Sequence, residues 1–281
     1  MKIIKTIPQM QKWSEALRRR GKTVGFVPTM GALHEGHLSL IRMARRRCDQ
    51  VVVSLFVNPA QFGPNEDYSR YPRDPGGDAA LCRREKADVL FMPAAGSIYP
   101  GGHDTKILVG RIGEVLEGAL RPGHFSGVAT VVAKLFNIVQ PQSAFFGQKD
   151  YQQTLVIKRL VRDLDFPVKI VVCPTVREKD GLAMSSRNRY LSAEEREAAR
   201  VLFKALRKGR ERVQGGERDA AAVRDAMTLL IQEQPLAEID YVAIAHPETL
   251  QEVPAVEDPV VLLLAVRIGR TRLIDNLTVR P

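Results

Sequence analysis

Short apolar runs alternate with amphipathic stretches through the first half of the chain. The runs at 23–29, 50–57 and 88–93 are rich in Val, Leu and Phe, and the stretches 37–48 and 78–87 place apolar residues at helical spacing. Strands that alternate with helices form βαβ units, in which crossover helices join parallel strands. The alternation therefore predicts an α/β fold with a parallel sheet and helices on both of its faces.

The pattern changes after about residue 184. Two amphipathic stretches, 192–213 and 218–234, predict helices, and three strand-like runs follow them. Helices followed by strands are typical of a small α+β domain. We therefore expect one domain at 1–184 and a smaller α+β domain at 185–281. The three strand-like runs are 238–245, 259–266 and 271–279.

Cysteine content and hydropathy bear on the location of the protein. Its three cysteines, Cys48, Cys82 and Cys173, are far apart and lack the spacing of a zinc site, which indicates buried thiols in a reducing compartment. The N-terminus lacks the apolar segment of a signal peptide, and the longest apolar run, 260–266, is too short to span a bilayer. We expect a cytoplasmic protein without a membrane partner.

The formal net charge of +10 raises the question of nucleic-acid binding. The basic runs at 18–20, 45–47 and 83–84 lie in helix-like stretches without the interleaved aromatic residues of single-strand binders. Solvated helix faces, with some preference for anionic small molecules, explain the charge better, so no nucleic-acid partner is expected. A basic RNA-binding module stays the non-enzyme alternative.

Two standard nucleotide-binding motifs are absent. The triplet "GKT" at 21–23 resembles the end of a P-loop, but Ala16 stands where the first glycine would be, and the triplet precedes a strand instead of following one. No G-x-G-x-x-G follows the first predicted strand, so a dinucleotide fingerprint is missing too.

The stretch at 28–37, "PTMGALHEGH", follows that strand and ends in two histidines. Its spacing differs from the H-E-x-x-H of zinc proteases and no third ligand is evident, which disfavours a protein-ligated metal. His34 and His37 would project to one side of a helix start, near backbone N–H groups that favour an anion. Gly31 and Gly36 would let the backbone approach a ligand closely. A phosphate site is indicated, with an ordinary turn as the alternative.

Polar residues also follow later apolar runs. Lys149 and Asp150 come after a glycine at a predicted strand end, where an ammonium could reach phosphate oxygens and a carboxylate could face Mg²⁺ or a ribose. An exposed ion pair is the alternative. Ser185, Ser186 and Arg187 offer two hydroxyls and a guanidinium in a loop that is either a turn or an anion clamp.

Seven strings, in order from about residue 24 to the C-terminal end, resemble those of the pantoate-beta-alanine ligase family. "HEGH" and "MSSR" also resemble the HxGH and KMSKS-type signatures of a wider nucleotidyltransferase superfamily, although "MSSR" lacks the first lysine of the KMSKS pattern. Arg187 and the two serines would then have to supply its phosphate contacts. The seven strings are "PTMGALHEGHLSL", "SLFVNPAQF", "YPRDP", "RPGHFSGVATVV", "FGQKDYQQ", "GLAMSSRN" and "RTRLIDN".

The resemblance implies a Rossmann-like catalytic domain, a smaller C-terminal lid domain and a homodimer. It implies that pantoate and beta-alanine are condensed to pantothenate while ATP is split to AMP and pyrophosphate, with Mg²⁺ required. Pantoyl adenylate would be the intermediate.

Site residues are carried over by position. His37 corresponds to the family's catalytic acid, Gln61 and Gln153 take the pantoate positions with Gln61 also near beta-alanine, and Asn58 is assigned to substrate binding. Mg²⁺ would bind with the ATP phosphates, near Asp150, without a metal site made by protein ligands alone. The expected donors to the reacting phosphates are His34, His37, Lys149, Ser185, Ser186 and Arg187. The expected ATP site comprises Met30, Gly31, Ala32, Leu33, His34, Glu35, Gly36, His37, Gly147, Gln148, Lys149, Asp150, Val176, Met184, Ser185, Ser186 and Arg187.

A related adenylyltransferase is the nearest rival enzyme class. It would share the "HEGH" chemistry but transfer AMP to a phosphate. The resemblance of "NPAQF" and "FGQKDYQQ" disfavours it, although the residue chemistry alone leaves it open.

Overall fold

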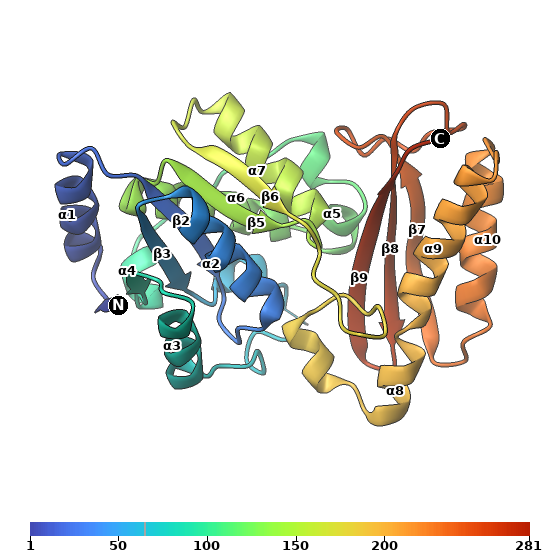
Figure 1. Cartoon of the computed structure of the whole chain (residues 1–281), viewed down its shortest axis with the longest axis horizontal. Helices are drawn as coiled ribbons and strands as arrows, with labels where there is room; N and C mark the ends of the chain where they lie inside the picture. Colours follow the sequence, from blue (N-terminus) through green and yellow to red (C-terminus); the bar gives the residue numbers. More distant parts are fainter. Residues whose placement is uncertain (65) are drawn as a thin grey trace. The chain divides into compact units, whose positions relative to one another are not determined.

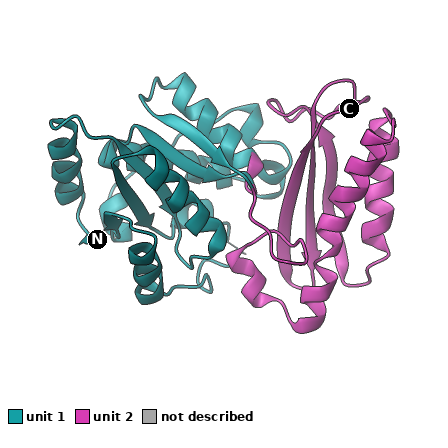
Figure 2. Cartoon of the chain, in the orientation of Figure 1, with its two compact units in different colours: residues 1–148, 152–174 teal, residues 149–151, 175–281 magenta. Residues whose placement is uncertain are grey.

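The computed structural model describes residues 1–64 and 66–281, which divide into two compact units (Figure 2). Unit 1 comprises Met1–Gln148 and Gln152–Pro174, and unit 2 comprises Lys149–Tyr151 and Thr175–Pro281. The division falls before the expected boundary between 184 and 185. The intervening residues belong to unit 2, where Arg177 and Ala183 form an antiparallel bridge.

Unit 1 contains a six-stranded sheet in which every pairing is parallel, in the order β1-β4-β3-β2-β5-β6. The predicted parallel sheet is confirmed. The edge strand β1 was not predicted, because three residues are too few to show a period. The strands are β1 (Lys2–Ile4), β2 (Val24–Thr29), β3 (Gln50–Leu55), β4 (Val89–Phe91), β5 (Ser143–Gly147) and β6 (Lys169–Cys173).

Helices pack on both faces of this sheet (Figure 1). Successive residues of β2 point to opposite faces: Phe26 meets Phe136 of α6 edge to face, whereas Val27 joins the core beneath α2 and α3. The helices of unit 1 are α1 (Ile7–Arg18), α2 (Glu35–Arg47), α3 (Pro75–Arg84), α4 (Ala95–Ile98), α5 (Glu117–Leu120), α6 (His124–Val139) and, apart from its first residue, α7 (Tyr151–Asp163), with 3₁₀ turns η1 (Pro59–Gln61) and η2 (Arg111–Gly113).

The strand order reverses direction between β2 and β5. The chain runs outward from β2 through β3 and β4 on one side, and through β5 and β6 on the other. Crevices at the carboxyl ends of strands at such a switch point are the usual ligand sites of open α/β sheets. The residues that follow β2, and Gly147 and Gln148 at the end of β5, lie at this edge.

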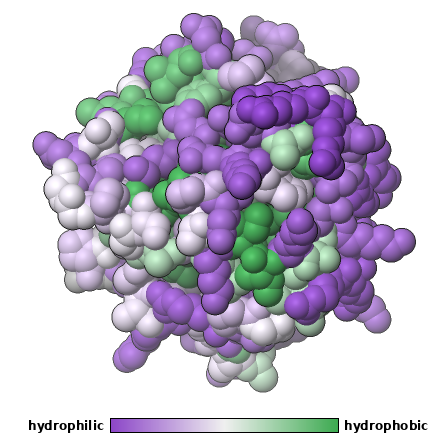
Figure 3. All heavy atoms as spheres, turned by 90° about the vertical axis from the view of Figure 1, so that its left-hand side faces the viewer, coloured by the Kyte–Doolittle hydropathy of each residue, from purple (hydrophilic) through white to green (hydrophobic). Residues whose placement is uncertain are grey.

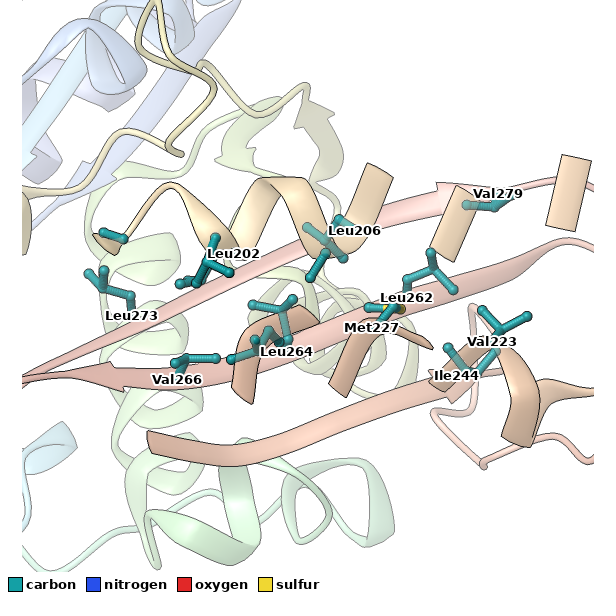
Figure 4. Packing of buried hydrophobic residues seen from close by; sticks show 14 of the residues in the cluster. Leu202, Leu206, Val223, Met227, Ile244, Leu262, Leu264, Val266, Leu273 and Val279 are labelled. Carbon is teal, nitrogen blue, oxygen red and sulfur yellow. The ribbon is translucent and has the colours of Figure 1, made fainter. Parts of the chain in front are cut away.

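Unit 2 contains an antiparallel sheet in the order β7-β8-β9, covered by helices (Figure 1). Its core is apolar: Leu206 of α9 and Met227 of α10 face Leu262 and Leu264 of the central strand (Figure 4). The elements are η3 (Ser186–Tyr190), α8 (Ala193–Ala198), α9 (Val201–Gln214), α10 (Ala220–Gln232), β7 (Ala237–Ala245), β8 (Val260–Ile268) and β9 (Thr271–Val279).

The helix predicted over 192–213 is in fact two helices, α8 and α9. Ser192 caps the first with the expected capping box, in which its side chain accepts from the backbone N–H of Glu195. The break falls at Ala199 and Arg200, where the N–H groups of Arg200 and Leu202 bond to carbonyls three residues back. This tighter 3₁₀-type turn separates the two axes, and the periodicity of the sequence does not reveal it.

The basic runs lie on exposed helix ends. Arg19 pairs with Glu15, and Arg45 pairs with Asp88 at 2.6 Å. The face shown in Figure 3 is mostly hydrophilic with scattered apolar patches. These observations favour the interpretation of solvated helix faces. Within the described part of the chain, no helix combines the length and apolar character needed to cross a membrane.

Candidate active site

The two histidines of "HEGH" open helix α2. His34 is the N-cap residue, and its Nδ1 accepts a hydrogen bond from the backbone N–H of Gly36 at 3.2 Å. His37, in the first turn, accepts from the backbone N–H of His34 through its own Nδ1 at 3.4 Å. The ring centroids are 4.1 Å apart. Each imidazole thus replaces the Ser or Glu of an ordinary capping box.

This capping arrangement fixes the tautomer of each ring in its neutral form. Because Nδ1 of His34 and Nδ1 of His37 accept from backbone N–H groups, the proton of each neutral ring is carried by Nε2. The helix start therefore presents two Nε2–H donors beside the positive end of a helix dipole. That combination is suited to an anionic ligand.

A buried carboxylate holds the loop between β2 and α2. Asp78 in α3 accepts from the backbone N–H groups of Ala32 at 2.9 Å and Leu33 at 2.7 Å. Ala32 has φ +51°, a left-handed conformation that costs energy for a residue with a side chain. Gly31 also has positive φ, and a Cβ there would come within 3.0 Å of Asp78. The charge-assisted bonds that Asp78 accepts hold the strained loop in this shape.

Gln61, an expected substrate residue, is brought beside the "HEGH" loop. Its Nε2 lies 3.0 Å from Sδ of Met30, and its Oε1 accepts from Nδ2 of Asn58 at 3.1 Å. Asn58 also donates to the carbonyl of Gly127 in α6 and accepts from the Tyr99 hydroxyl at 2.8 Å. A Cβ on Gly127 would lie 2.1 Å from the carbonyl oxygen of Ala60, so only glycine allows this close approach.

A half-buried histidine, His124, contacts the backbone of Gln61. The guanidinium of Arg121 is 3.1 Å from Nε2 of His124, and because arginine only donates, Nε2 is the acceptor. The proton is then on Nδ1, which donates to the carbonyl of Gln61 at 2.8 Å. Glu66 accepts two bonds from Arg121, at 2.6 and 2.7 Å. The chain Glu66, Arg121, His124 fixes the backbone of Gln61.

The environment of His124 lowers its pKa to about 4. Burial is the main cause, and the charge of Arg121 acts in the same direction, while Gln61 and the carboxylates of Glu66 and Glu117 oppose it. At Glu66 burial alone would raise the pKa, but the bonds from Arg121 outweigh it and lower the pKa. The histidine is therefore neutral in the folded protein near pH 7.

Stability is expected to depend on pH through His124. Its folded pKa of about 4 lies below the ordinary 6.5, so the unfolded chain binds the proton more tightly. The stabilisation is complete above pH 6.5 and is lost as the pH falls toward 4. In this interval the free energy of unfolding should fall by up to about 1.4 kcal/mol per pH unit. Urea unfolding at several pH values gives the slope of the free energy of unfolding against pH for the wild type and for His124→Asn, which lacks the titrating ring. Equal slopes in the two proteins would contradict the assigned role of His124.

Helix α7 carries the other expected pantoate residue. Gln152 is buried and donates to the carbonyls of Ile112 and Val115, while its Oε1 accepts from the N–H of Glu117 at 3.1 Å. Gln153 is its half-buried neighbour in the first turn. The structural glutamine and the expected substrate glutamine are thus adjacent, and the sequence pattern does not tell them apart.

The remaining candidate residues belong to unit 2. Lys149 Nζ lies 3.5 Å from Asp150, and the lysine side chain is 18% exposed against 48% for the aspartate. In the segment 176–187, the N–H of Met184 donates to the carbonyl of Val176 at 3.0 Å. Ser185 caps the 3₁₀ turn η3 by accepting from the N–H of Arg187 at 3.2 Å, and Ser186 is buried.

Among the described residues, no group of three or more His, Cys, Asp or Glu side chains could hold a metal ion. Cys48, Cys82 and Cys173 are free thiols. Burial raises the pKa of Cys82 to about 12, so it stays protonated.

Comparison with known proteins identifies the family. A model of that family, described as pantoate-beta-alanine ligase, matches residues 2–278. The chain belongs to the pantoate-beta-alanine ligase family.

Relatives in this family match the chain over its whole length. The pantothenate synthetase of Moorella thermoacetica is 55% identical over 276 residues, which is 98% of both proteins. The crystal structure of pantothenate synthetase from Thermus thermophilus is 50% identical, covers 100% of both chains and has a TM-score of 0.95. Pantoate-beta-alanine ligase from Francisella tularensis, complexed with beta-gamma ATP and beta-alanine, is 38% identical over 99% of this chain and 97% of its own, with a TM-score of 0.82.

Several supporting residues escaped the sequence analysis of this ligase fold. Asp78 and Arg121 are ordinary charged residues in the sequence, and only the contacts of Asp78 with Ala32 and of Arg121 with His124 show what they do. The sequence did contain a weak signal, because the strings "RPGHFSGVATVV" and "RTRLIDN" resemble the family although no role had been assigned to them.

Proposed function

We propose that this chain condenses pantoate with beta-alanine, in an ATP-dependent reaction that gives pantothenate, AMP and pyrophosphate. Full-length membership of the pantoate-beta-alanine ligase family, at 55% identity to a pantothenate synthetase, carries the proposal. The geometry at the start of α2 agrees with it, because two imidazole N–H donors at a helix N-terminus suit a phosphate ligand.

The reaction would proceed in two steps. The pantoate carboxylate attacks the α-phosphorus of ATP, which forms a carboxylate oxygen to phosphorus bond and releases pyrophosphate. The amine of beta-alanine then attacks the carbonyl carbon of pantoyl adenylate, loses a proton and expels AMP as the amide forms. Adenylation is needed because a free carboxylate is a poor acylating agent, whereas AMP is a good leaving group.

In the first step negative charge builds up on the phosphoryl oxygens, so preorganised donors matter more than a protein nucleophile. His34 and His37 would contribute Nε2–H groups, and Lys149 an ammonium. We assign Ser185, Ser186 and Arg187 to the same phosphates. In this assignment His37 acts as a hydrogen-bond donor to the phosphates through its Nε2.

Neutral amides are suited to bind pantoate. An arginine paired with the carboxylate would stabilise the ground state and blunt its attack on ATP. Gln61 is held in place by Asn58 and His124 and would bond to the pantoate hydroxyls and carboxylate without this penalty.

Replacing Gln153 with alanine should raise the KM for pantoate roughly tenfold, the value of one lost hydrogen bond of about 1.4 kcal/mol. The KM for ATP should change by less than about twofold, because the amide is assigned to pantoate only. Steady-state kinetics with each substrate varied in turn measures both. The control is Arg162→Ala, at an exposed position on the same helix. Equal increases in the two KM values would count against the assignment.

Mg²⁺ fits the proposed chemistry. The half-exposed carboxylate of Asp150 is a hard oxygen ligand of the kind that Mg²⁺ takes together with substrate phosphates. When bound, the ion would neutralise phosphate charge in the first step. Asp150 would hold it, while Lys149 would stay directed to the phosphates.

We further propose a homodimer in the cytoplasm, with unit 2 acting as a lid. The homodimer and the lid follow the family resemblance. Three free thiols, of which Cys82 and Cys173 are buried, agree with a reducing compartment. A lid would protect pantoyl adenylate, an acyl anhydride, from water.

ATP-pyrophosphate isotope exchange tests the function directly. With ATP and Mg²⁺, exchange should require pantoate and occur without beta-alanine, and pantothenate should appear only when the amine is added. ATP binding without exchange or product would refute the proposed substrates and favour an adenylyltransferase. Tight, salt-sensitive RNA binding without ATP turnover would favour a binding module instead.

A further inference from the structure

All but the first residue of the string "RTRLIDN" lie in β9, at the edge of the antiparallel sheet of unit 2. Successive residues of a strand face opposite sides of the sheet. Leu273 and Val279 of β9 pack into the core under α9 and α10 (Figure 4), so Asp275 shares their side and Asn276 faces the other. Both polar residues are buried, with 2% of each exposed, although they lie in an apolar sheet.

Asp275 holds the segment 176–187 through an arginine. Arg177 makes two bonds to its carboxylate, at 2.5 and 2.9 Å, and stacks over the ring of Phe203 in α9 at 4.0 Å. Arg177 also donates to the carbonyl of Gly181 and pairs with Ala183 across the hairpin. The start of the segment that leads to Ser185 and Arg187 is thereby anchored to β9.

On the opposite side of β9, Asn276 holds the segment that contains Lys149, the other residue assigned to the ATP phosphates. Its Nδ2 donates to the backbone carbonyl of Lys149 at 2.9 Å. Two residues further, the hydroxyl of Tyr151 donates to the carbonyl of Pro247 at 2.8 Å. Lys149–Tyr151 is accordingly part of unit 2, although its neighbours in the chain on both sides belong to unit 1.

We propose that Asp275 and Asn276 are positioning residues for adenylation, which hold Lys149 and the segment 176–187 in fixed register so that both engage the ATP phosphates together. Donors stabilise a transition state only when they are already in place as charge develops. Because Asp275 and Asn276 are adjacent on β9, they hold in place two donor segments that are far apart in the sequence. The inference rests on the proposed function, since the phosphate roles of Lys149, Ser185 and Arg187 come from it.

A double-mutant cycle tests whether Asn276 acts through Lys149. Single-turnover formation of pantoyl adenylate is measured for the wild type, Asn276→Ala, Lys149→Ala and the double variant, with enzyme in excess. Asn276→Ala should slow the step roughly tenfold to a hundredfold, the scale of a misplacement of about 1 Å, with the KM for pantoate unchanged. In the Lys149→Ala background the same change should have less than about a twofold effect. If the losses in rate from Asn276→Ala and Lys149→Ala are additive, the inference is overturned. Additivity would mean that Asn276→Ala slows the step equally with and without the Lys149 ammonium, as a general effect on structure would.

The control variant is Asp240→Asn. Asp240 on β7 pairs with Arg272 of the same "RTRLIDN" string at 2.5 Å, so its replacement disturbs β9 at a residue other than Asp275 and Asn276. Its adenylation rate should stay within about twofold of the wild type. A loss equal to that of Asn276→Ala would also overturn the inference.

Two further measurements keep the outcome decisive. If thermal unfolding shows that Asn276→Ala is unfolded at the assay temperature, the nearly isosteric Asn276→Asp replaces it, because a carboxylate cannot donate to the Lys149 carbonyl. Wild-type enzyme without pantoate-dependent adenylation would refute the proposed function itself. Active wild-type enzyme with an additive cycle would refute the positioning role alone.

Discussion

The His37→Ala variant is expected to form pantoyl adenylate roughly 10²-fold or more slowly than the wild type, the scale for loss of one transition-state donor. The structure gives the physical reason. Nδ1 of His37 caps the backbone N–H of His34, so the ring is fixed in orientation and its Nε2–H is the group that would donate to developing phosphoryl charge. Single-turnover experiments with ATP and pantoate, without beta-alanine, measure the step.

Two comparisons sharpen this result. His37→Gln keeps an amide N–H donor, so a partial recovery over alanine would favour hydrogen-bond donation over acid catalysis. Arg46→Ala changes an exposed residue at the far end of α2 and should leave the rate unchanged. Unaltered adenylation in His37→Ala would refute the role assigned to this residue.

The largest effect on stability is expected at the Arg177 and Asp275 pair. Asp275 is buried, with 1% of its side chain exposed, and Arg177 makes two bonds to it. Removing the guanidinium by Arg177→Ala leaves the buried Asp275 carboxylate without its ion-pair partner, which should lower the free energy of unfolding by about 3–5 kcal/mol. Urea unfolding at pH 7 measures the loss.

The loss of stability in Arg177→Ala should depend on pH through protonation of the Asp275 carboxylate. Burial raises the pKa of Asp275, and Arg177 opposes this effect in the wild type. Arg177→Ala removes the larger part of this opposition and leaves the backbone N–H of Asn276 and the charge of Lys149, so the carboxyl accepts a proton more readily and the loss should shrink as the pH is lowered. A loss that grows on acidification would contradict this account.

The matched control is Arg267→Ala. Arg267 is 45% exposed and pairs with Asp240, which keeps Arg272 as a second partner. Its removal should cost less than about 1 kcal/mol, the usual range for exposed ion pairs. A similar loss of unfolding free energy in Arg177→Ala and Arg267→Ala would mean that burial of the ion pair does not determine how much it stabilises the fold.

The regular elements of the fold could be predicted from local pattern. Apolar runs such as 50–57 mark strands because a strand buried on both faces is apolar throughout, and the stretch 37–48 marks a helix because one face is buried. Prediction failed where local pattern carries little information. The strand β1 is three residues long, and the break between α8 and α9 depends on two backbone turns at Ala199 and Arg200.

The candidate site divides in the same way. Residues adjacent in sequence, such as His34 and His37, were recognised because their spacing around a helix start follows from helix geometry. Asp78 and His124 were not, because their partners lie 46 and 63 residues away in the chain. The catalytic and binding roles assigned to the site residues stay predictions that the variants above test.

The sequence by itself determined the fold class, the family and the local chemistry of each motif, since hydrophobic period and short-range spacing are written in neighbouring residues. The tertiary structure alone decided which tautomer each histidine adopts, which residues hold Gln61 and Lys149, and that Lys149–Tyr151 belongs with the C-terminal sheet. The physical reason is that buried hydrogen bonds depend on which distant groups share a site from which water is excluded. Spacing along the chain does not specify those partners.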